Sequence, residues 1–181
     1  MRGRASRRAA AVLADDVRAF GALGYRAGPR HDPLRARLSA EGRPDLRIVL
    51  APTGGRVFGG TFAMEASTAE PVLPATGGVT ARGRGAVRLQ GFRFRGRDET
   101  GRSLAERLEA DGELVKALSA VHFEQIRVEP DGRAVIRHMG GSLVWLLFPP
   151  MARPIPIVPE QVWATVAALE AFERAGRSAR R

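Results

Sequence analysis

The residues best suited to chemistry in this chain are arginines, and three of them alternate along one expected strand. Arg93, Arg95 and Arg97 occupy every second position. Because strand side chains alternate between faces, these three should project together from one face of a sheet. Forked guanidinium donors on a shared surface bind phosphate or carboxylate groups. If their strands belong to the same sheet, three further arginines join this predicted anion-binding surface: Arg88, Arg127 and Arg137.

The simpler explanation of these arginines is a solvated outer face in a chain whose coding favours arginine. The sequence has 28 arginines and one lysine, Lys116, a bias typical of GC-rich coding. A run of charge is usually solvated surface. Exposed aromatic residues that would stack on bases are not evident, since the phenylalanines fit core positions and Tyr25 is the sole tyrosine. Nucleic acid, an acidic protein and an anionic lipid surface therefore all stay open as partners.

A second candidate is an acid–base pair at the end of a predicted hairpin. Residues 129–132 fit a type I turn with Pro at its second and Gly at its fourth position. The resulting register sets Ile126 opposite Ile136 and His138 across from Glu124. A carboxylate partner would raise the proton affinity of His138, which suits a pH-sensitive or acid–base role. A structural pair that closes the hairpin is the alternative.

Other motifs that carry chemistry are missing. The absence of cysteine excludes disulfides, thiolate metal sites and cysteine nucleophiles. His31-Asp32 lacks the further His and Asp that a metal-dependent phosphohydrolase needs. The glycine-rich residues 54–60 lack the lysine of a phosphate loop and precede a strand. Gly141-Ser142 lacks the closing glycine of a nucleophile elbow. We therefore predict no metal and no cofactor, and a binding module rather than an enzyme.

The formal charge of +10 is concentrated in three places. Residues 1–8 and 174–181 each hold four arginines, and residues 82–102 hold seven arginines against two acids. We expect basic disordered tails over residues 1–8 and 177–181, with a single domain over residues 9–176. The apolar patch after Arg8 is too short for a signal core, and no segment reaches the ~20 apolar residues that cross a bilayer. These features predict a soluble, cytoplasmic protein.

Four helical segments are expected around the strands. The first covers residues 6–24, where apolar side chains form one stripe. Ser103 and Glu106 form a capping box that would start a central helical pair. Asp111 would start the second member of that pair, because aspartate is a favoured N-cap residue. The last helix is predicted over residues 159–176, with Pro159 in its first turn.

Alternating apolar residues predict the strands. The clearest examples lie in residues 34–38, 46–50, 58–64 and 87–97. One extra residue near Gln90-Gly91 restores the alternation in the last of these, which indicates a β-bulge. The apolar run Leu143–Phe148 predicts a strand covered on both faces, and residues 153–157 an edge strand or polyproline segment. Residues 66–85 lack periodicity and are expected to form a long loop or flap.

The order of elements predicts an α+β domain. Sequential strands with short connections favour an antiparallel sheet of about five to seven strands, with the helices packed on one face or at the ends. In general character the chain resembles bacterial domains whose C-terminal half is a helix, a hairpin and a helix. We predict a non-catalytic binding or interaction module. One alternative is an arginine-based binder of an anionic polymer or surface, and a second is an enzyme that uses His138 and Glu124.

Overall fold

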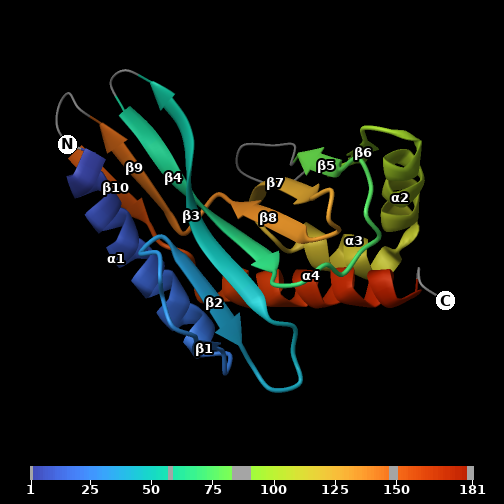
Figure 1. The fold of residues 1–181 in the computed structure, drawn as a ribbon, viewed down its shortest axis with the longest axis horizontal. Coiled ribbons are helices and arrows are strands. Elements are labelled where there is room, and N and C mark those ends of the chain that lie inside the picture. The colour runs from blue at the N-terminus through green and yellow to red at the C-terminus, as the bar shows by residue number, and fades with distance from the viewer. Residues whose placement is uncertain (1, 57–58, 83–90, 147–150, 179–181) are drawn as a thin grey trace.

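A computed structural model describes residues 2–56, 59–82, 91–146 and 151–178 (Figure 1). Its helices are α1 (Arg2–Gly21), α2 (Glu99–Ala110), α3 (Gly112–Ser119) and α4 (Pro159–Ser178). Its strands are β1 (Arg26–Ala27), β2 (Arg35–Ser39), β3 (Leu46–Arg56), β4 (Gly59–Thr68), β5 (Val79–Arg82), β6 (Phe94–Gly96), β7 (Phe123–Val128), β8 (Ala134–His138), β9 (Ser142–Leu146) and β10 (Met151–Ile155). The predicted α+β class is confirmed. Within the described ranges, ten strands form one antiparallel sheet, which is larger than expected.

The sheet is organised around β4. The first half of β4 pairs with β9 and its second half pairs with β8. On its other side β4 pairs along its length with β3. The sheet continues from β8 through β7 and β5 to β6, and from β9 to the edge strand β10. It therefore has two arms that share β3 and β4, and Figure 1 shows them at opposite ends of the molecule.

Helices α1 and α4 cover one face of the sheet. The even-numbered side chains Leu46, Ile48 and Leu50 of β3 are buried in the core against this layer, because alternate strand residues point to the same face. Odd-numbered Arg47 and Val49 lie on the other face and are only half-buried. In Figure 1, β3 crosses in front of α4, so the helix layer lies behind the sheet in that view. The face toward the viewer is left open.

The central helical pair begins earlier than predicted. Asp98 is the N-cap of α2, and its Oδ1 accepts a hydrogen bond from the Gly101 amide at 2.7 Å. The start predicted at the Ser103 capping box is therefore wrong, since an aspartate upstream supplies both a cap and a charge that suits the helix N-terminus. The predicted start at Asp111 is confirmed, because its Oδ1 accepts from the Leu114 amide at 3.0 Å.

Residues 66–85 are not a flap in their described part. Residues 66–68 belong to β4, and residues 79–82 form β5. Between them, the amides of Val72 and Leu73 donate to the Gly132 carbonyl at 3.1 and 3.0 Å, and the Leu73 side chain is buried. The segment lacks periodicity because its backbone hydrogen bonds go to a turn rather than to a ladder. Residues 83–90, including Gln90 of the predicted bulge, lie outside the described residues.

Packing of this segment against α4 can be tested at Gly176. A Cβ built at Gly176 would overlap the carbonyl oxygen of Val72. Gly176→Ala is therefore expected to lower the free energy of unfolding by about 2 kcal/mol, although alanine is the better helix former. Urea denaturation measures this change. Gly21→Ala is the matched control, because a Cβ on that helical glycine meets nothing within 4 Å. Equal free energies of unfolding for the two variants would contradict the close contact between Gly176 and Val72.

The termini and the apolar strand also differ from expectation. Helix α1 begins at Arg2 and α4 ends at Ser178, so residues 2–8 are helical rather than a disordered tail.

Strand β9 is covered on both faces only at its start: Leu143 is 1% exposed, whereas Leu146 is 39% exposed. The prediction of a strand covered on both faces is wrong for its described part, because only the edge strand β10 follows β9 in the sheet. Residues 147 and 148 of the predicted strand lie outside the described residues. In the described ranges, no helix combines the length and apolarity needed to span a membrane.

Candidate anion-binding groove

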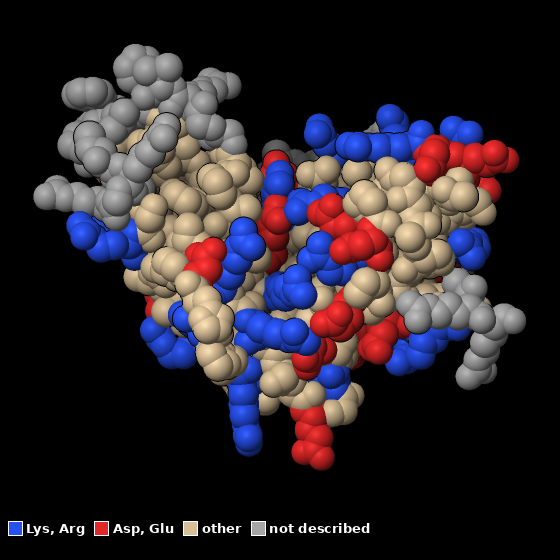
Figure 2. Space-filling view, viewed as in Figure 1, with Lys and Arg blue, Asp and Glu red and all other residues tan. Residues whose placement is uncertain are grey.

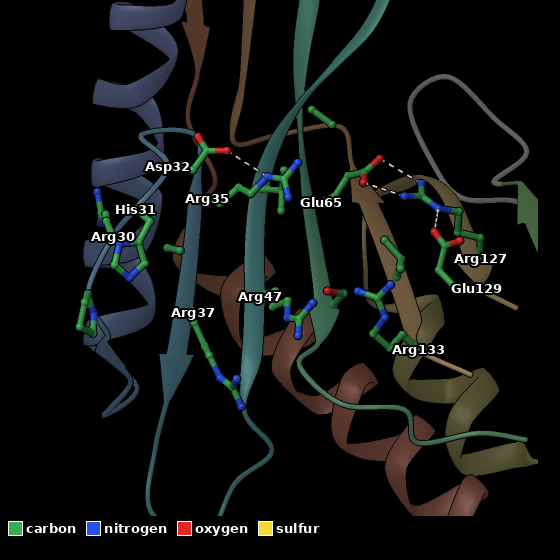
Figure 3. Close-up of a pocket in the computed structure, with 16 residues that line it drawn as sticks. Arg30, His31, Asp32, Arg35, Arg37, Arg47, Glu65, Arg127, Glu129 and Arg133 are labelled. Atoms are coloured by element: carbon green, nitrogen blue, oxygen red, sulfur yellow. Dashed lines mark hydrogen bonds and ion pairs between the residues drawn. The ribbon is translucent and has the colours of Figure 1, made fainter. Parts of the chain in front are cut away.

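The open face of the sheet carries a groove of about 530 Å³ (Figure 3). Strands β2, β3, β4, β8 and β7 run side by side beneath it, and the loop before β2 forms one wall. The strand register places residues that are distant in sequence in one row across these strands: Arg37, Arg47, Ser67, Val135 and Arg127. The neighbouring row contains Arg35, Val49, Glu65 and Arg137.

The groove is lined by more arginines than carboxylates. Six arginines contribute to it: Arg30, Arg35, Arg37, Arg47, Arg127 and Arg133. Three carboxylates oppose them: Asp32, Glu65 and Glu129. The space-filling view shows basic and acidic side chains gathered along the middle of this face (Figure 2). Val49, Ala51 and Val135 give the groove apolar surface as well. The groove is therefore basic, with apolar contacts available between its charges.

Glu65 on β4 binds two of the arginines on this face. Arg127 donates to both carboxylate oxygens, at 3.0 and 2.7 Å, and Arg137 donates twice to Oε1, at 2.9 and 2.7 Å. Glu65 is only 8% exposed. Burial by itself would raise the pKa of this carboxyl, but the hydrogen bonds from Arg127 and Arg137 outweigh burial and lower it. The hydrogen bond to Glu65 likewise raises the pKa of Arg127.

Arg47 on β3 differs from these neutralised arginines. It lies half-buried in the groove, with Arg37 and Ser67 on the strands beside it. Arg37 binds Asp45 and Glu70 at 3.2 and 3.1 Å. Arg47 forms no hydrogen bond or ion pair with any residue that the structure describes, and Figure 3 shows its guanidinium in the open groove. Partial burial of a cation without a counter-charge raises the free energy of the folded protein. A bound anion would offset this cost, so Arg47 is available as an anion-binding group.

The structure places the predicted arginines at different distances from the groove. Arg127 lines it, and Arg137 reaches the same carboxylate. Arg95 pairs with Thr80, which pairs with Arg127, so Arg95 lies further along the same row of the sheet. Arg93 and Arg97 are exposed beside β6, and Arg88 lies outside the described residues. Anion binding by these six residues stays a prediction.

The predicted pairing of Glu124 with His138 is wrong. The register shifts between Phe123 and Gln125, so His138 pairs with Phe123 and Glu124 is exposed at the irregularity. His138 is 2% exposed, and its Nε2 lies 3.1 Å from the Thr165 hydroxyl of α4. Burial, and then the charge of His122, lower the pKa of His138 to about 3, which is opposite to the predicted direction. Glu124 is therefore not the partner of His138 that the acid–base interpretation requires.

His138 instead has a structural hydrogen bond. The Thr165 hydroxyl donates its proton to the Gln161 carbonyl one turn earlier in α4. The hydroxyl must therefore accept from the ring, which assigns the proton of neutral His138 to Nε2. This bond connects β8 to α4 within the core and satisfies a buried polar group.

The residues of the groove that sequence reasoning missed include Arg35, Arg37, Arg47 and Glu65. The alternation of Arg35 and Arg37 with apolar neighbours on β2 did place these arginines on a polar face. The missing information was the pairing of β4 with β8, which brings Glu65 next to Arg137. Local sequence patterns carry no signal for such a long-range neighbour.

The loop before β2 offers no metal-binding cluster. His31 and Asp32 line the groove wall, and Asp32 binds Arg35 at 3.1 Å and accepts from the Leu34 amide at 2.8 Å. Throughout the part of the chain that the structure describes, no three His, Cys, Asp or Glu residues are grouped so that they could hold a metal ion. Guanidinium groups are the most numerous charged groups that line the groove.

Comparisons with curated proteins and with solved structures found no match to this chain. A family model described as a protein of unknown function, DUF3156, matches residues 24–175. The match spans every strand of the sheet and thus the whole groove, and begins after α1. Because the match covers most of the sequence, the chain belongs to the DUF3156 family.

Proposed function

We propose that this protein binds an anionic ligand in the groove of the open sheet face, with a phosphate or carboxylate group against Arg47. The observation that carries the proposal is the unpaired guanidinium of Arg47 in a concave basic site. A bound anion would supply the counter-charge that no described residue provides. The ion pairs of Glu65 and Asp32 hold neighbouring arginines in place, so the donors are ordered before the ligand arrives.

The size and lining of the groove favour a small organic anion. A volume of about 530 Å³ lies within the range of roughly 300–1,000 Å³ that is usual for small-molecule sites. Val49, Ala51 and Val135 would contact an apolar part of such a ligand. The expected class is therefore a phosphorylated or carboxylated metabolite. An anionic polymer is the second candidate, because the row that contains Arg127 continues along the sheet to Arg95.

Arg47→Ala tests the proposal. Loss of a charge-assisted hydrogen bond is expected to weaken anion binding at least about tenfold. Isothermal titration calorimetry with inorganic phosphate, citrate and a mononucleotide measures the change. Arg102→Ala on α2 is the matched control, because it removes the same charge from an exposed position outside the groove. If both variants weaken binding equally, the anions respond only to net charge. If none of the anions binds the native protein, the small-anion assignment is wrong.

A single-stranded oligonucleotide separates the two candidate ligand classes. A polymer that follows the row should lose affinity steeply with salt and should bind more weakly to Arg95→Ala. A small anion confined to the groove should be insensitive to Arg95→Ala, because Arg95 does not line it.

A further inference from the structure

One end of the molecule combines exposed apolar side chains with arginines, and the segments that form it contain no acidic residue. It is formed by the start of α1, the far ends of β3 and β4, and the strands β9 and β10, which meet at the corner where the N-terminus lies (Figure 1). The chain has 19 acidic residues, yet residues 1–14, 46–64 and 132–159, which supply these elements, contain none. We call this region the acid-free end.

The apolar side chains of the acid-free end lie on β9 and β10. Leu146 and Met151 face each other across the two strands and are 39% and 45% exposed. Together with Val144, Pro154, Ile155 and Pro156 they line a groove of about 500 Å³. Large side chains this exposed, gathered on neighbouring strands, indicate an interaction surface. This surface is separate from the arginine groove, with which it shares no lining residue.

Arginines lie at the same end of the molecule as this apolar surface. Arg153 is the sole charged residue that lines the β10 groove, and it forms no ion pair with any residue in the described ranges. Arg7 and Arg8 are exposed on α1, and the sequence adds Arg2 and Arg4 at the start of the same helix. With no acids in these segments, the charge is not neutralised locally, in contrast to the mixed charges of the arginine groove.

These two properties together match an anionic lipid bilayer. Apolar side chains enter the interface between headgroups and acyl chains, while arginines bind the phosphates of the headgroups. Addition of a strand from a second chain is a poorer fit to the β10 edge, because Pro154 within this strand lacks a backbone donor. We propose that the acid-free end docks on the surface of an anionic membrane, with Leu146 and Met151 entering the interface.

Vesicle flotation of the full chain tests this proposal. The protein is expected to float with vesicles in which a third of the lipid is phosphatidylglycerol, to float weakly with pure phosphatidylcholine, and to lose binding as salt increases. Leu146→Asp/Met151→Asp should reduce the bound fraction about tenfold. Trp163→Asp is the matched control for an apolar-to-acid change, because Trp163 is 56% exposed on α4. Equal binding to both vesicle types, or equal loss in both variants, would overturn the proposal.

The arginines are tested with a pair of charge-matched variants. Arg7→Glu/Arg8→Glu should abolish flotation, whereas Arg174→Glu/Arg177→Glu makes the same change in net charge near the C-terminus, at the far end of the molecule in Figure 1, and should preserve it. Circular dichroism melts verify that each variant is folded. Loss of flotation in both would mean that net charge alone drives binding, and the proposal would fail.

Three further outcomes locate the binding elsewhere. Loss of flotation in Arg47→Ala would assign lipid to the arginine groove instead of the acid-free end. Saturable binding of soluble glycerol phosphate, reduced by Arg153→Ala, would identify a free phosphate ester as the ligand. A dimer that dissociates in Leu146→Asp/Met151→Asp, seen by light scattering without lipid, would show that a second copy covers the apolar surface. Each of these results would overturn membrane docking at this end.

Discussion

Glu65→Gln is expected to lower the free energy of unfolding by about 3 kcal/mol at neutral pH. The substitution keeps the shape of the side chain but removes the charge shared by Arg127 and Arg137. Arg127 would retain Glu129, at 2.6 Å, whereas Arg137 would keep no ion pair among the described residues. A half-buried guanidinium without a counter-charge is costly, and this cost dominates the change.

The pH dependence of this effect has a defined sign. The pKa of Glu65 in the folded state is below its ordinary value of 4.5. Its ion pairs therefore stabilise the protein fully above about pH 4.5 and lose this contribution as the pH falls through the lower folded pKa. Denaturant unfolding at pH 7 and pH 3 should show a smaller difference between Glu65→Gln and the native protein at the lower pH. A difference that is unchanged at pH 3 would contradict this explanation.

A matched control and a binding measurement complete the test. Glu70→Gln removes an exposed partner of Arg37, and such exposed pairs are usually worth less than about 1 kcal/mol. Glu65→Gln should also strengthen anion binding, because it removes a negative charge from the groove while Glu129 still holds Arg127 in place. A lower free energy of unfolding together with tighter anion binding would indicate loss of a groove carboxylate. General loss of structure would instead lower both the stability and the affinity.

Asp16→Asn is expected to have the opposite effect on stability, a gain of about 3 kcal/mol at pH 8. Asp16 of α1 is 2% exposed, and its Oδ2 has no hydrogen-bond partner among the described residues. Burial, and then the charge of Asp15, raise the pKa of Asp16 to about 7. Above that pH the folded protein carries a buried, incompletely paired carboxylate. Asparagine has the same shape without the charge.

The gain should disappear in acid. Between the ordinary pKa of 3.8 and the folded value of about 7, the folded chain holds a proton that the unfolded chain has released. Stability contributed by protonated Asp16 is therefore complete below about pH 4 and is lost as the pH rises through 7. Thermal melts of Asp16→Asn and of the native protein at pH 4.5 and pH 8 measure the difference. Glu106→Gln, at an exposed position of α2, is the control. An equal gain at both pH values would exclude ionisation as its cause.

Local features of the fold could be predicted from the sequence. The turn at residues 129–132 correctly predicted Ile126 opposite Ile136, because turn chemistry and the two-residue period of a strand determine register between close neighbours. The start of α4 at Pro159 and the edge position of β10 also follow from local rules, since proline lacks a backbone donor.

Two kinds of feature could not be predicted in this way: those that depend on a choice between alternative residues, and those that depend on contacts between residues far apart in the sequence. Asp98 and Ser103 are both acceptable N-cap residues, and sequence alone does not say which one begins α2. The irregularity at Glu124 shifts His138 by one residue after a regular stretch, with no glycine or proline to indicate it. The candidate groove required the position of β4 between β3 and β8, which is a property of the whole sheet.

The double pairing of β4 also has a consequence for the order of folding. The β3–β4 and β7–β8 hairpins each join close segments and can form early, whereas Glu65 meets Arg127 and Arg137 across 62 and 72 residues of chain. The first hairpin carries Arg47 and Glu65, and the second carries the two arginines that Glu65 binds. The groove is therefore assembled only when the hairpins join along β4. A ligand that spans both would oppose their separation and slow the local opening of the sheet.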